Sequence, residues 1–143
     1  MTRTIFAAWH ADSLIDLGRI DQAREIARSV LAGRGDRDAD RLPRLDQAYA
    51  WLVLSLADRA GWKLPEARAN MNLALDQARL ARQQPHLANV ILNAADLGVV
   101  EALRAMRDGN DWESHLKNDV APLLAEARSI VRPETSRNCL GLY

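Results

Sequence analysis

Apolar residues recur along most of the chain at spacings of three and four positions, the periodicity of an amphipathic α-helix. The first segment shows the pattern with Phe6, Trp9, the pair Ser13 and Leu14, and Leu17 on one stripe. No stretch alternates apolar and polar residues for long enough to indicate a strand. With Gly, Pro and polar runs taken as helix boundaries, the pattern predicts helices at 4–17, 21–32, 45–60, 65–82, 85–107 and 111–131.

The interruptions between these segments predict how the chain is organised. Residues 33–43 are polar, charged and broken by Gly and Pro, which is typical of a linker. Residues 133–143 have no periodicity and are predicted to form a C-terminal tail. Pro122 is expected to kink the last helix or to split it at Asp119. Residues 1–132 are then a single helical domain made of three antiparallel hairpins at 4–32, 45–82 and 86–131.

The first hairpin carries a motif in which Leu14, the turn residue Gly18, Ala23 and Ala27 follow one another at fixed offsets. The second hairpin has similar residues at the corresponding positions, and its turn is expected to be one residue longer. These residues are Trp51, Leu54, Ser55, Leu64, Ala67, Met71 and Ala74. Small residues at such positions let two helices approach closely. Over residues 4–82 the pattern resembles a tetratricopeptide repeat, although its period of 44 residues exceeds the standard ~34.

The resemblance implies an all-α fold of the tetratricopeptide-like α-solenoid type. Longer repeats of roughly this kind occur in helical sensor domains of bacterial transcription regulators, which this sequence resembles in general character. A compact six-helix bundle whose alanine-rich packing imitates the motif is the alternative. In a solenoid, the first helix of each hairpin lines a concave face that binds extended peptides or helices of a partner.

Composition narrows the classes of function. The 143 residues include 19 basic and 19 acidic side chains, so there is no basic excess for binding a nucleic acid. One cysteine excludes an internal disulfide framework and a multi-cysteine metal site. The longest uncharged apolar-rich run, residues 48–57, is about half of the ~20 residues that cross a bilayer. We therefore expect a cytoplasmic protein that binds neither nucleic acid nor membrane.

Residues with catalytic potential are few. His115 has Asp111 four residues before it and Asp119 four residues after it, so one helical face could carry all three. A metal or acid–base site and a solvent-exposed set of ion pairs are both compatible with that spacing. Cys139 lies in the predicted tail, where a structured catalytic pocket is not expected. No nucleophile and base stand at a defensible spacing, so the sequence predicts no catalytic residue, no metal ligand and no cofactor.

The polar and aromatic residues of the predicted concave face point to recognition of a protein. Asp12 and Asp16 share a helical face with Trp9, and the amides of Asn89 and Asn93 suit recognition of a peptide main chain. Asp96 shares the helical face of Asn89 and Asn93, while Trp62 lies in a turn and is expected to be an exposed aromatic residue. The predicted partner-binding residues are Trp9, Asp12, Asp16, Trp62, Asn89, Asn93 and Asp96. We predict a protein-interaction module that acts as an adaptor, chaperone or regulatory subunit. The alternatives are a small-ligand-binding or enzymatic bundle, and a structural homo-oligomer, such as a homodimer, in which the apolar arcs of the helices at 45–60 and 85–107 form the dimer face.

Overall fold

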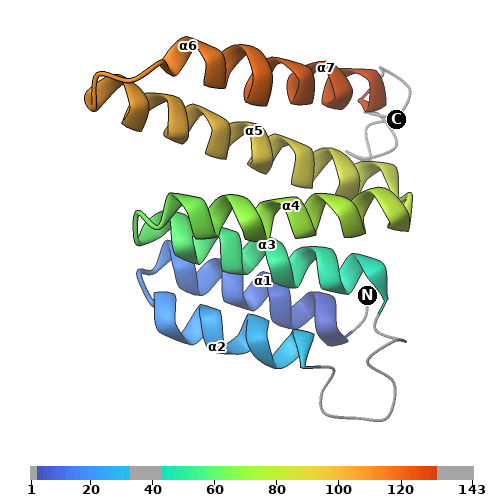
Figure 1. Cartoon of the computed structure of the whole chain (residues 1–143). Helices are drawn as coiled ribbons and strands as arrows, with labels where there is room; N and C mark the ends of the chain where they lie inside the picture. Colours follow the sequence, from blue (N-terminus) through green and yellow to red (C-terminus); the bar gives the residue numbers. More distant parts are fainter. Residues whose placement is uncertain (1–2, 33–42, 132–143) are drawn as a thin grey trace. The chain divides into compact units, whose positions relative to one another are not determined.

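The structure is a computed structural model that describes residues 3–32 and 43–131, with side chains from Trp9 onward in the first helix (Figure 1). Within these ranges every regular element is helical, so the all-α prediction is confirmed. A helical bundle, the alternative to the solenoid, fits the observed helices. Most of the predicted linker, the predicted tail and Cys139 lie outside the described residues.

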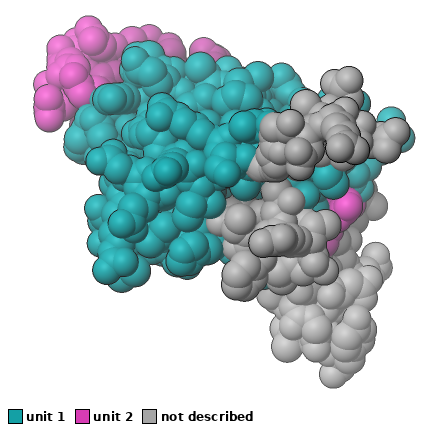
Figure 2. All heavy atoms as spheres, turned by 90° about the horizontal axis from the view of Figure 1, so that it is seen from below, with its two compact units in different colours: residues 1–82 teal, residues 83–143 magenta. Residues whose placement is uncertain are grey.

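The chain divides after Arg82 into two compact units, which Figure 2 shows in different colours. The division falls between the second and third predicted hairpins. Whether residues 1–132 form one repeat-like domain therefore stays a prediction, and each unit is described by itself.

Unit 1 consists of two helical hairpins joined through the central helix α3. Its helices are α1 (Arg3–Asp16), α2 (Ile20–Leu31), α3 (Arg44–Ala60) and α4 (Leu64–Ala81). Helix α3 contacts α1, α2 and α4 and is buried along most of its length, which accounts for its wide apolar arc. Alanine dominates the buried positions because small side chains let helix axes come close; the core includes Ala11, Ala23, Ala27, Ala48, Ala57, Ala67, Met71, Ala74 and Ala78.

The two hairpins of unit 1 have turns of the same length. Three residues separate α1 from α2, and three separate α3 from α4, so the prediction of a longer second turn is wrong. Both turns close with a Schellman pattern: the Arg19 N–H donates to the Leu14 carbonyl at 2.7 Å, and the Lys63 N–H donates to the Asp58 carbonyl at 2.9 Å. Both turns lie at the same end of the unit (Figure 1).

The left-handed residue of each turn is the one that the Schellman pattern places just beyond the helix. In the first turn it is Gly18, with φ +76°. In the second it is Trp62, with φ +58°, whereas the neighbouring Gly61 has φ −87°. In the sequence, Gly61 marks the end of α3, but the left-handed conformation that glycine usually adopts belongs to Trp62, one position later.

Unit 2 is built on the long helix α5 (Gln84–Arg107). A short helix α6 (Trp112–His115) follows, then a π-helical turn η3 (Leu116–Val120) and α7 (Ala121–Ile130). The Ala121 N–H donates to the Leu116 carbonyl, five residues earlier. Pro122 lies in the first turn of α7, where its missing N–H costs nothing. The widened turn before it is the break that Pro122 predicted.

Gly98 of α5 lies directly against η3. A methyl group added there would lie 2.7 Å from Val120 Cγ2 and 3.3 Å from the Asp119 carbonyl oxygen. Both distances are shorter than ordinary van der Waals contact, so only glycine fits between the two backbones. The glycine in the middle of a helix is therefore explained by packing.

Candidate functional site

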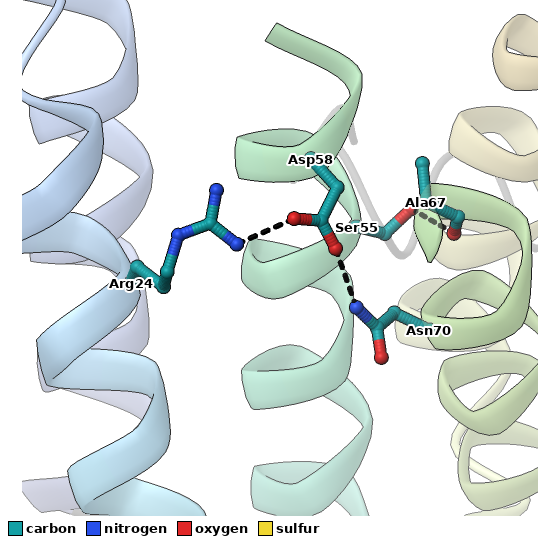
Figure 3. Close-up of polar contacts among 5 residues, drawn as sticks. All are labelled: Arg24, Ser55, Asp58, Ala67 and Asn70. Carbon is teal, nitrogen blue, oxygen red and sulfur yellow. Dashed lines mark hydrogen bonds and ion pairs between the residues drawn. The ribbon is translucent and has the colours of Figure 1, made fainter. Parts of the chain in front are cut away.

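A buried carboxylate connects three helices of unit 1 (Figure 3). Asp58, in the last turn of α3, accepts from Arg24 of α2 on one oxygen and from Asn70 Nδ2 of α4, at 2.7 Å, on the other. Its side chain is 6% exposed, and that of Arg24 is 18% exposed. The end of a helix disfavours a negative charge, so the donors from α2 and α4 are what stabilise it there. With both oxygens occupied, Asp58 holds helices together and is not open to a ligand.

A second buried polar contact lies one turn earlier on α3. The hydroxyl of Ser55 donates to the Ala67 carbonyl of α4 at 2.7 Å (Figure 3). The sequence pattern predicts neither this contact nor the Arg24–Asp58–Asn70 cluster. The repeat offset holds a signal for the cluster, because Asp58 occupies the place that the buried Leu14 has in the first hairpin.

Trp62 is the large aromatic side chain most open to solvent among the described residues, with 59% of its surface exposed. Its position just after α3 gives it a left-handed backbone. That conformation costs a non-glycine residue about 1–2 kcal/mol, and a bulky residue in it is a genuine outlier. The fold thus holds an apolar ring in water at a position where glycine would be less strained.

The predicted residues of α1 lie together on its outer face. Ala11 and Leu14 face the core, while Trp9, Asp12 and Asp16 point away from it, Trp9 with 44% of its surface exposed. Partial burial raises the pKa of the Asp12 carboxyl, and the negative charge of Asp16 one turn away raises it further. This face therefore combines an exposed aromatic ring with two acidic groups.

The predicted residues of α5 belong to unit 2, whereas those of α1 belong to unit 1. Asn93 Nδ2 donates to the Asn89 carbonyl at 2.9 Å and lies 3.4 Å from Asn89 Oδ1. The two amides are thus partly satisfied by each other. Asp96 is exposed and has no hydrogen-bond or ion-pair partner in the described part of the chain.

The residues around His115 separate into two local contacts. His115 Nδ1 lies 3.1 Å from Asp119 Oδ2, one turn apart. Asp111 instead caps α6: its carboxylate accepts from the Ser114 hydroxyl at 2.5 Å and from the Ser114 N–H at 3.2 Å. These hydrogen bonds lower the pKa of Asp111. The three side chains do not converge, and in the described ranges no group of three His, Cys, Asp or Glu residues is placed to hold a metal.

The chain was compared with protein-family models, curated proteins and solved structures. None of them matches it. A functional assignment therefore rests on the residues themselves.

One helix among the described residues, α5, is long and apolar enough to cross a bilayer by length and composition. Half of its apolar 18-residue stretch is buried inside the structure. Buried core helices of soluble proteins satisfy the same criteria, so α5 is weak evidence for a membrane protein.

Proposed function

We propose that this chain is a protein-interaction module whose main anchor is Trp62. The observation that carries the proposal is the exposure of this ring on a strained backbone. Strain of this kind is typical of functional sites, and tryptophan is enriched among the residues that dominate binding energy at protein interfaces. A partner that covers the Trp62 ring would bury apolar surface that the free chain exposes to water, and this burial would stabilise the complex.

Leu17 extends the anchor. It directly precedes the left-handed Gly18 of the first turn and is one of the exposed large apolar residues. Because both turns lie at one end of unit 1 (Figure 1), a partner with an apolar segment can use both. The outer face of α1 adds Trp9 with Asp12 and Asp16, a combination that suits a partner with basic residues next to the apolar segment.

The tetratricopeptide-like arrangement of residues 4–82 is part of the proposal. It is supported by the equal turns, by the buried Ala23 and Ala67 at the same place 44 residues apart, and by α3 packing on both helices of the first hairpin. A stack of this kind presents a surface to a peptide or helix. We propose a cytoplasmic adaptor, chaperone or regulatory subunit with a protein or peptide partner and no cofactor.

Quantitative capture tests the role of Trp62. The tagged chain and its Trp62→Ala, Trp62→Gly and Leu80→Ala variants are incubated with native lysate, and bound proteins are measured by mass spectrometry. Leu80, on α4, is 56% exposed and is a matched apolar control. We expect a stoichiometric partner to be retained by the parent and the Leu80 variant and lost from both Trp62 variants. Equal capture by all four proteins, or capture of the chain alone, would refute the proposal.

A further inference from the structure

Helix α5 exposes a regular apolar seam on the side opposite its buried face. The seam consists of Leu92, Asp96, Val99, Leu103 and Met106, which follow one another at alternating spacings of four and three residues. All four apolar members are exposed, Leu103 with 57% of its surface. Alternating steps of four and three are the heptad pattern by which two helices pack side by side. The regular spacing therefore indicates a helix as the occupant of the seam.

The charges on α5 indicate which helix packs against the seam. Asp96 is the single charged member of the seam and has no partner in the described residues. Arg107 is next to Met106 at the end of the helix; its side chain is 72% exposed and lies 3.7 Å from Asp108, a long contact. Arg104 makes the shorter contact with Asp108, at 2.9 Å. The seam thus has an unpaired acidic group near its middle and an available basic group at its end.

We propose that the seam binds a second copy of this chain, with the two α5 helices antiparallel. In the register that pairs Val99 with Leu103 of the second copy, Asp96 lies opposite Met106 and beside Arg107 of that copy. Two symmetric ion pairs then flank an apolar centre. This proposal is independent of the proposed function, which rests on Trp62 of unit 1.

Other arrangements of two copies are less favourable. Parallel helices would place one Asp96 carboxylate directly opposite the other. An antiparallel register one heptad away would place the two carboxylates in neighbouring layers. Like charges held across an apolar seam repel each other and lose hydration. Asp96 therefore acts as the residue that selects orientation and register, a role known for polar residues in heptad seams.

Sedimentation equilibrium across a range of protein concentrations measures the association. The seam is short, so we expect a weak dimer whose fraction rises with concentration. Leu103→Glu is expected to raise the dimer Kd by at least about tenfold. Leu80→Glu changes a leucine of nearly equal exposure on α4 and is expected to leave the dimer Kd unchanged. Circular dichroism checks that both variants keep their helices.

A charge exchange tests the antiparallel register. Asp96→Lys alone and Arg107→Glu alone each place like charges together and should each weaken the dimer several-fold. The double variant Asp96→Lys/Arg107→Glu restores opposite charges and should recover most of the association. Recovery in the double variant is not expected if the substitutions act only on the folding of α5.

Cysteine crosslinking tests orientation in a Cys139→Ser background. A mixture of the Val99→Cys and Leu103→Cys variants should form the mixed disulfide in preference to either symmetric one. A preference for the symmetric Val99→Cys disulfide would indicate parallel helices and overturn the proposal. It is also overturned by a monomer at all concentrations, by a dimer that Leu103→Glu does not weaken, or by α5 binding lipid vesicles while the chain stays monomeric.

Discussion

The two turns of unit 1 allow a direct test of where each helix leaves the right-handed conformation. Gly18, with φ +76°, has no atom within 4 Å of an added methyl, so the effect of Gly18→Ala comes from the backbone alone. A left-handed alanine costs about 1–2 kcal/mol, while alanine gains ~0.4–1 kcal/mol by restricting the unfolded chain. We expect Gly18→Ala to lower the free energy of unfolding by about 1 kcal/mol.

Gly61→Ala is expected to have the opposite sign. Gly61 has φ −87°, which alanine adopts without strain. The nearest atom to an added methyl is the Asp58 carbonyl oxygen at 3.6 Å, an ordinary contact. Only the effect on the unfolded chain remains, so this variant should be more stable than the parent by ~0.4–1 kcal/mol.

Trp62 completes the series because it has the left-handed φ of the second turn. Trp62→Gly and Trp62→Ala lose the same ring contacts and differ in the strain of the added methyl. The Gly variant should therefore be the more stable of the two by roughly 0.5–1 kcal/mol. The difference in stability between the two variants measures the backbone strain separately from the loss of the ring contacts.

Urea unfolding followed by circular dichroism and by tryptophan fluorescence measures all four variants. Thermal midpoints give a second reading, because 1 kcal/mol shifts the midpoint of a unit of this size by roughly 4–8 °C. Two results would refute the assignment of the left-handed backbone to Gly18 and Trp62. One is that Gly61→Ala destabilises the chain while Gly18→Ala does not. The other is that Trp62→Ala is at least as stable as Trp62→Gly.

Three further substitutions test the packing and the electrostatics. Gly98→Ala gains ~1 kcal/mol of helix propensity but pushes a methyl group against the stiff Val120 side chain, at a cost of ~1–3 kcal/mol. Urea unfolding should therefore show a net loss of stability of about 1 kcal/mol. A gain in stability would contradict the close approach of η3 to Gly98. Arg24→Met leaves the buried Asp58 carboxylate with one side-chain donor. It should lower the free energy of unfolding by about 3 kcal/mol, the lower end of the range for breaking a buried pair. A loss below about 0.5 kcal/mol would show that the pair is solvent-screened. Asp12→Asn removes a carboxyl whose raised pKa makes its ionisation less favourable in the folded chain than in the unfolded chain. At neutral pH we therefore expect a small gain in stability, within the ~0.5 kcal/mol typical of surface substitutions. The gain should vanish below the ordinary pKa of 3.8, and a gain that persists at low pH would refute the electrostatic cause.

Much of the candidate site could be located from the sequence, and part of it could not. The sequence places Trp62 in the turn between the predicted helices 45–60 and 65–82, where a large aromatic residue is expected to be exposed. Its strained backbone is not predictable from the sequence, because Gly61 is next to it and glycine is the usual left-handed residue. The spacing places Asp96 on one helical face with Asn89 and Asn93, but the heptad seam is recognised only when burial separates the two sides of α5.

Periodicity alone determined the helices, because each must bury one apolar stripe and the three- and four-residue spacing records that stripe locally. The break caused by Pro122 was also local, since a proline ring excludes the hydrogen bond of its own turn. Contacts between distant segments were decided by the tertiary structure. Arg24 meets Asp58, 34 residues away, and Gly98 has no room for a side chain only because η3 lies against α5. The pattern within one helix cannot specify which side chain of another helix will lie opposite.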